Sequence, residues 1–169
     1  MPDTPLGEIT LSGAEAEIRF VRQFDHPPQM VWAALTQPAR LAQWLAPGEI
    51  DLKPGGAVRL DFGDSGVVID STVMAYAPGR LLEYSWSGPG DPLRPVRWEL
   101  EAAECGVRLT LTLQLPIAED IARACAGWEA HLEMLAAALE EVPIKFPFET
   151  FKTRREAYKA ELGLAPAAP

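Results

Sequence analysis

The chain has 169 residues, of which 48% are hydrophobic and 23% are charged, a composition typical of one soluble globular domain with short extensions. The net charge of −9 argues against nucleic acid or an anionic membrane as a partner, and no apolar run approaches the roughly 18 residues of a membrane-spanning helix. The two cysteines, Cys105 and Cys125, make a disulfide framework improbable.

No metal or cofactor is expected, because the two cysteines and the two histidines lack zinc-type spacing and the sequence has no phosphate-binding loop. Residues 1–10 have no basic segment followed by an apolar one, so they do not resemble a secretory signal and the expected location is the cytoplasm. Residues 1–14 are polar and rich in turn formers, and we expect a flexible lead there.

The first regular segment is residues 15–24, where Ala16, Ile18 and Phe20 alternate with polar residues in the pattern of a strand. The apolar spacing then becomes helical over residues 28–45. Pro38 interrupts this stretch, so two short helices are predicted after the first strand.

Residues 49–114 return to alternation, with turn sequences rich in proline and glycine between the segments. The last of them places Val107, Leu109, Leu111 and Leu113 on one face and polar residues on the other. We therefore predict about six antiparallel strands here, each with one apolar face and one solvated face.

A long helix is predicted over about residues 117–141. Its apolar residues recur at intervals of three and four, at Ile121, Cys125, Trp128, Leu132, Leu135 and Leu139. Strands segregated from helices indicate an α+β fold in which the long helix packs on an antiparallel sheet. Because one helix covers a curved sheet incompletely, we expect a cavity between helix and sheet.

Three segments resemble signatures of a known family: VWAALTQPARLAQWL at 31–45, PGRLLEYSW at 78–86 and AGWEAHLEML at 126–135. The chain is similar to the activator of heat-shock-protein-90 ATPase-like branch of the START, polyketide-cyclase and birch-pollen-allergen (SRPBCC) superfamily. The resemblance covers about residues 15–142. It implies a helix-grip (START-like) fold, a curved antiparallel sheet of about seven strands wrapped around a long C-terminal helix, with an internal cavity.

The predicted organisation is a lead at residues 1–14, a helix-grip domain at 15–142 and a C-terminal extension at 143–169. The extension has an amphipathic pattern over about residues 148–162, with a stripe at Phe148, Phe151, Arg155, Tyr158 and Leu162. This helix would dock on its own domain, on a second subunit or on another protein, so both a monomer and a homodimer are compatible with the sequence.

The predicted ligand-binding residues are aromatic or apolar side chains on the faces that turn toward the cavity: Trp44, Tyr84, Trp86, Trp98, Trp128, His131 and Leu135. Each ring is also compatible with plain core packing, which the strand positions of Tyr84, Trp86 and Trp98 favour. His131 has three interpretations: a half-buried structural residue, a polar contact for a ligand, or a catalytic base. No catalytic residues are assigned, because no motif supplies a nucleophile or an orienting carboxylate beside it.

Asp70 interrupts the apolar segment GVVIDSTVMAY, and its direction depends on which face of that strand turns inward. The more apolar alternative places Ile69, Ser71 and Val73 inside, which leaves Asp70 in solvent.

Three functions follow from these observations. The first is a non-catalytic domain that binds a small apolar molecule in the cavity. The second, from the resemblance alone, is a stress-response or chaperone-regulating interaction module, although the co-chaperones carry a further N-terminal domain that these 169 residues lack. The third is a cyclase-like or hydrolase-like enzyme, for which Asp70, Glu83 and His131 are the ionisable candidates.

Overall fold

A computed structural model describes residues 5–63, 67–87 and 91–163, which form eight strands and four helices. Their bounds, in chain order, are β1 (Glu8–Ser12), β2 (Glu15–Phe24), α1 (Pro28–Thr36), α2 (Pro38–Trp44), β3 (Gly48–Ile50), β4 (Ala57–Asp61), β5 (Val68–Ala77), β6 (Leu81–Tyr84), β7 (Val96–Ala103), β8 (Gly106–Pro116), α3 (Ile121–Leu139) and α4 (Phe148–Glu161).

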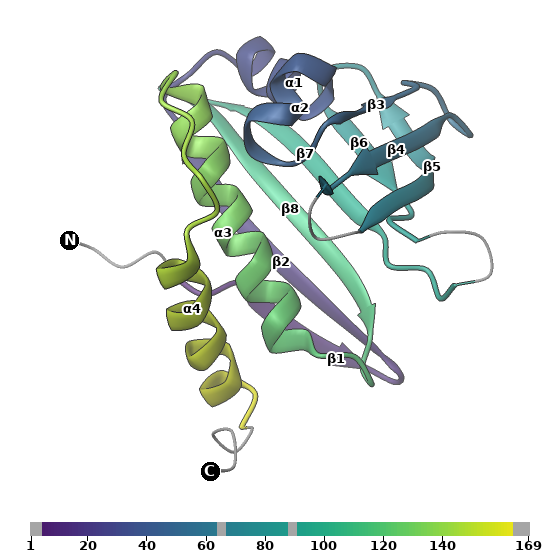
Figure 1. Ribbon diagram of the computed structural model, residues 1–169, viewed down its shortest axis with the longest axis vertical. Helices are drawn as coiled ribbons and strands as arrows, with labels where there is room; N and C mark the ends of the chain where they lie inside the picture. Colours follow the sequence, from purple (N-terminus) through teal and green to yellow (C-terminus); the bar gives the residue numbers. More distant parts are fainter. Residues whose placement is uncertain (1–4, 64–66, 88–90, 164–169) are drawn as a thin grey trace.

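The described strands join into one antiparallel sheet in the order β1-β2-β8-β7-β6-β5-β4-β3. In Figure 1, α3 runs along the sheet in front of β2 and β8, α1 and α2 lie at one end, and α4 lies beside α3. This is the α+β helix-grip arrangement that the sequence predicts. None of the helices in the described residues combines the length and the apolar character needed to span a membrane.

The two strands with the clearest alternation, β2 and β8, are neighbours in the second and third positions of the sheet. Ile18 lies opposite Leu113 and Phe20 opposite Leu111, and all four side chains are buried. Because side chains alternate between the two faces of a strand, this register directs one apolar face of each strand toward α3.

The buried face of α3 is the stripe that the sequence predicts, since all six of its members are buried. The helix begins at Ile121, later than the expected residue 117, because the Asp120 side chain accepts a hydrogen bond from the Arg123 backbone N–H at 3.0 Å and caps the helix. Its C-terminal end follows at Leu139.

The N-terminal lead contains a strand that the sequence pattern did not predict. β1 pairs with β2, with Ile9 opposite Ile18, and becomes the eighth strand. Four of its five residues are exposed, so its place depends on backbone hydrogen bonds to β2 more than on burial. A strand of this kind has little hydrophobic periodicity for sequence reasoning to detect.

Pro38 separates α1 from α2 and leaves a backbone carbonyl of α1 without its usual donor. Proline lacks an N–H and disfavours helical geometry in the residue before it, and Gln37 is accordingly extended, with φ −82° and ψ 132°. The Trp44 indole N–H donates to the carbonyl oxygen of Ala34 at 2.7 Å within the core. Trp44, the last residue of α2, thus supplies the hydrogen-bond donor that the Ala34 carbonyl of α1 lacks.

We expect Trp44→Phe to lower the free energy of unfolding by about 2–3 kcal/mol, because it leaves a buried carbonyl unsatisfied and removes part of a packed ring. Urea denaturation monitored by circular dichroism measures the change. Trp32→Phe is the matched control on α1: Trp32 is only partly buried and stacks on Tyr76, so its replacement should cost much less. Equal costs for the two variants would contradict this account of Trp44.

α4 lies against α3 of its own chain. Tyr158, the only α4 side chain that is fully buried among the described residues, contacts the Phe20 ring edge to face at 6.5 Å between centroids. Its hydroxyl donates to the buried Glu129 carboxylate of α3 at 2.5 Å. The amphipathic helix of the extension therefore docks, through Tyr158, on α3 and β2 of its own chain.

Candidate functional site

An open groove of about 840 Å³ lies between α3, the sheet and the connection from α3 to α4. Its floor is apolar and comes from the sheet, through Ile69 of β5, Val96 of β7, and Leu113 and Leu115 of β8. Small-molecule sites typically have volumes of roughly 300–1,000 Å³ and predominantly apolar walls, and this groove fits both descriptions.

Aromatic rings dominate the walls: Phe62, Trp86, Trp128, His131, Phe146, Phe148 and Phe151. Trp128 occupies the middle of this set, with its ring centroid 5.0 Å from Trp86 and 6.0 Å from His131. Phe62 belongs to the same cluster, with its ring centroid 6.0 Å from Trp86 and 6.0 Å from His131. Rings at such separations present apolar faces and edges that suit a flat, apolar guest.

Trp86 has a backbone conformation that is unfavourable for a large residue. Its φ is 58°, in the left-handed region, which costs a non-glycine residue on the order of 1–2 kcal/mol. The two flanking serines hold this turn: the Ser85 hydroxyl accepts from the Thr72 N–H at 3.2 Å, and the Ser87 hydroxyl donates to the Pro92 carbonyl at 2.6 Å. Strain of this kind concentrates at functional sites, which marks Trp86 as the leading residue of the groove.

His131 brings a polar group to the aromatic wall. Its Nδ1 donates to the Trp44 carbonyl oxygen at 3.0 Å, since a carbonyl only accepts. In the neutral ring Nε2 is therefore the unprotonated nitrogen and serves as a hydrogen-bond acceptor. Burial lowers the pKa of His131 below its usual 6.5, while the hydrogen bond to Trp44 acts in the opposite direction.

Charged residues gather at one end of the groove. The Arg94 guanidinium donates to both carboxylate oxygens of Glu119, at 2.8 and 3.0 Å from Nε and 2.6 Å from Nη2. This contact raises the pKa of Arg94 and lowers the pKa of Glu119. Asp120 and Arg123 line the same end, and Asp120 pairs with Arg155 of α4 at 3.2 Å.

The seven predicted ligand-binding residues divide into two groups. Trp86, Trp128 and His131 line the groove. Trp44, Tyr84, Trp98 and Leu135 are at most 1% exposed and fill the space between helix and sheet. The expected internal space is thus occupied by these side chains, and the described residues leave a groove that opens to solvent.

The ionisable residues considered for catalysis lie mostly outside this groove. Asp70 is exposed on β5, whose buried positions are Ile69, Ser71 and Val73, as the more apolar alternative predicted. Glu83 lies beside Arg97, with 3.8 Å between their charged atoms, on the other face of β6 from Tyr84. Of the three candidates, only His131 lines the groove.

Residues 5–63, 67–87 and 91–163 place neither thiol nor metal chemistry at the groove: Cys105 is exposed and does not line it, and Cys125 is buried. Burial raises the pKa of Cys125 to about 12, so its thiol stays protonated at neutral pH. In the same ranges, no three histidine, cysteine, aspartate or glutamate residues are placed together to hold a metal ion.

A second hollow crosses the outer face of the sheet and is lined by arginine and glutamate side chains. Arg97 pairs with Glu99 at 3.2 Å, and Arg108 with Glu101 at 3.7 Å. Such exposed cross-strand pairs are usual on a solvated sheet face. None of the described residues that line this hollow is aromatic, so the groove is the better candidate for binding an apolar ligand.

Sequence reasoning missed several groove residues because they come from irregular segments. Phe62 follows β4, and Phe146 lies in the connection before α4. Phe148 and Phe151 belong to the amphipathic stripe of the extension, but spacing alone does not reveal that the stripe reaches a ligand groove.

The fold and the groove together define a START-like helix-grip domain. The chain belongs to the activator of Hsp90 ATPase homolog 1-like protein family, whose model matches residues 25–140. This confirms the resemblance found in the three sequence signatures. No curated protein matches the chain.

Solved structures with the same fold include proteins from several bacteria. BPP1335 from Bordetella parapertussis is 30% identical, with a TM-score of 0.72, over 97% of this chain and 94% of that one. CalU16 from Micromonospora echinospora is 24% identical, with a TM-score of 0.73, over 92% of this chain and 93% of that one. DynU16, from the dynemicin biosynthetic locus, is 31% identical, with a TM-score of 0.68, over 75% of this chain and 48% of that one.

The lowered pKa of His131 predicts a pH dependence of stability. Below the usual pKa of 6.5, the unfolded chain binds a proton that the folded chain resists, so the free energy of unfolding falls as the pH decreases from about 7. The variant His131→Gln keeps a donor for the Trp44 carbonyl and removes this titration. Urea denaturation between pH 7.5 and 5.5 should show a smaller decrease in the free energy of unfolding for the variant than for the parent. An equal decrease in the two proteins would contradict the prediction.

Proposed function

We propose that the protein binds a small, largely apolar, ring-containing molecule in the groove between α3 and the sheet. The observation that carries this proposal is Trp86, a groove residue that occupies left-handed backbone space although glycine would occupy it without strain. Backbone strain is therefore present at a position whose ring lines the groove, as expected for a residue that contacts a ligand.

The rest of the groove supports a ligand with an apolar body and a few polar groups. The aromatic walls and aliphatic floor would supply the contact area, and Nε2 of His131 would accept a hydrogen bond from a ligand hydroxyl or amide. The kinship with DynU16, from a biosynthetic locus, is in keeping with a natural product or its precursor as the ligand.

The two alternative functions have less support. An enzyme would need ionisable partners for His131, but Asp70 and Glu83 lie away from the groove. The carboxylates that do line the groove, those of Glu119 and Asp120, are paired with Arg94 and Arg155. Chaperone regulation rests on the family description alone, since the aromatic groove offers no argument for it. Binding without catalysis is therefore the function that the geometry favours.

Replacement of Trp86 separates a role in binding from a role in stability. We expect Trp86→Gly to weaken binding at least tenfold, or about 1.4 kcal/mol, because a central ring of the groove is lost. We also expect it to be more stable than Trp86→Ala, since glycine accepts the positive φ without strain. Isothermal titration calorimetry with quercetin, palmitate and cholesterol measures binding, and urea denaturation measures stability.

Trp32→Ala is the control for this experiment, because Trp32 stacks on Tyr76 outside the groove. This variant should bind the ligands as tightly as the parent protein does. The proposal is wrong if the parent protein binds neither quercetin nor cholesterol, the two probes that contain rings, or if Trp86→Gly binds them as tightly as the parent.

A further inference from the structure

One wall of the groove comes from outside the segment that the family model matches. That segment ends at residue 140, whereas Phe146 lies in the connection after α3, Phe148 begins α4, and Phe151 follows one turn later. All three phenylalanines line the groove. The C-terminal extension therefore shapes the same space as the helix-grip domain.

The three phenylalanines continue the aromatic row of the domain. The Phe146 ring lies 5.6 Å from His131 and is nearly perpendicular to it, with 67° between the ring planes. From Phe146 the row continues to Phe148 at 4.9 Å and to Phe151 at 5.8 Å. On the other side of His131 the row reaches Trp128 of α3 and then Trp86, which follows β6, so rings from both sides of the groove form one connected surface.

We propose that Phe146, Phe148 and Phe151 determine ligand specificity, and that they favour molecules with several rings over molecules with one or two fused rings. This inference rests on the proposed function, because it concerns the same groove. A short ligand can be held by Trp86 and Trp128 alone, and only a longer one reaches past His131 to the phenylalanines.

The exposure of Phe148 supports a ligand on this side of the groove. Its side chain is 66% exposed, the highest value among the large hydrophobic residues that the structure describes. A ligand that extends along the aromatic row would remove apolar area of this ring from water, and such burial favours binding.

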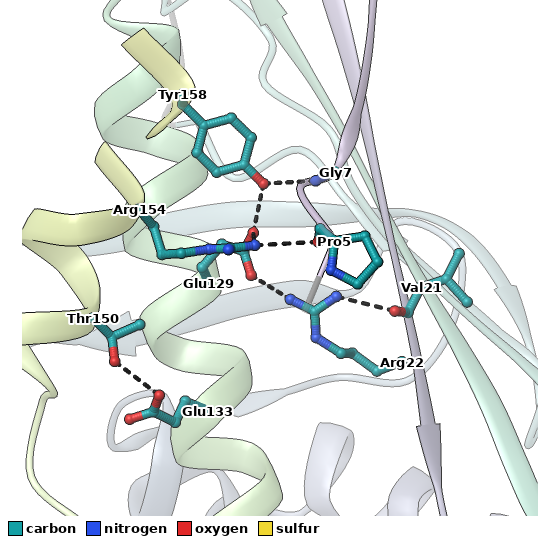
Figure 2. Close-up of polar contacts among 9 residues, drawn as sticks. All are labelled: Pro5, Gly7, Val21, Arg22, Glu129, Glu133, Thr150, Arg154 and Tyr158. Carbon is teal, nitrogen blue, oxygen red and sulfur yellow. Dashed lines mark hydrogen bonds and ion pairs between the residues drawn. The ribbon is translucent and has the colours of Figure 1, made fainter. Parts of the chain in front are cut away.

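A buried polar cluster keeps the phenylalanine wall in place, and Figure 2 shows its contacts. Glu129 of α3 is only 4% exposed, and its carboxylate accepts from Arg22 of β2, from Arg154 of α4 at 2.8 Å and from the Tyr158 hydroxyl at 2.5 Å. The Tyr158 oxygen also accepts from the Gly7 backbone N–H at 2.7 Å. A buried carboxylate needs such partners, so α4 is tied to α3, to β2 and to the N-terminal segment at one point.

Two more contacts position the first turns of α4. The Thr150 hydroxyl donates to the Glu133 carboxylate at 2.8 Å, as Figure 2 shows, and Arg155 pairs with Asp120 at 3.2 Å. Thr150 lies between Phe148 and Phe151 in the sequence, so this hydrogen bond places both rings relative to α3. The wall thus has a defined position, as a determinant of specificity requires.

The test compares two probes of different length on the full chain by isothermal titration calorimetry. Quercetin has three rings, and 1-naphthol has two fused rings. We expect Phe146→Ala and Phe151→Ala each to lower the affinity for quercetin at least fivefold. The affinity of each variant for 1-naphthol should change less than twofold. Phe148→Ala, at an exposed position, keeps the test valid if a more buried variant fails to fold, and Val142→Ala is the matched control, since Val142 is exposed and lies outside the groove.

The outcomes distinguish this inference from the proposed function. If Trp86→Gly lowers the affinity for both probes while the phenylalanine variants bind quercetin as tightly as the parent does, the specificity role is wrong and the proposed function stands. If the parent protein binds neither quercetin nor 1-naphthol, the specificity role is wrong, and the proposed function fails as well only if cholesterol does not bind either. If the phenylalanine variants lose affinity for quercetin and for 1-naphthol by the same factor, the proposed role in specificity is also wrong.

Arg154→Met tests whether the polar cluster positions the wall. The variant keeps an apolar stem and leaves Arg22 and Tyr158 as partners of Glu129. We expect it to lower the ratio of quercetin affinity to 1-naphthol affinity at least threefold, an effect that a loss of stability alone would not produce. An unchanged ratio in a folded variant would overturn the positioning role.

Discussion

The Trp98 indole lies where the sheet, α2 and α3 meet, and the packing of the domain depends on it. It contacts Trp44 and Trp128 edge to face, at 5.6 and 5.7 Å between ring centroids, and its N–H donates to the Tyr84 hydroxyl at 2.8 Å. Burial raises the pKa of Tyr84, so this hydroxyl remains neutral. Since a buried indole needs both close packing and an acceptor, these contacts fix the distance between helix and sheet.

That filled interior explains where the groove is. The rings of Trp44, Tyr84 and Trp98 occupy the space beneath α3, so a ligand would be accommodated only along the flank of the helix. Trp86 lies on this flank just after the end of β6, where its ring stacks on Tyr84 at 6.0 Å and its φ is positive. One strained residue thereby marks the boundary between core and groove.

The order of elements and the buried faces were predictable, because hydrophobic periodicity reports burial directly. The α3 stripe and the β8 alternation are examples in which every apolar position is buried. The same signal does not distinguish a ring in the core from a ring at a groove: Trp98 and Trp86 both follow strand alternation, but Trp98 is fully buried and Trp86 lines the groove. β1 and Phe146 could not be predicted either, since one depends on strand pairing and the other on how a connection folds back.

The signature that joins α1 to α2 has a chemical logic that extends beyond this chain. Pro38 creates a carbonyl acceptor at Ala34 with no backbone donor, and Trp44 supplies the missing donor from the end of the next helix. The two residues therefore form a mutually dependent pair. In relatives that share the signature, a change at the proline should relax the requirement for tryptophan, and the two positions would be expected to vary together during evolution.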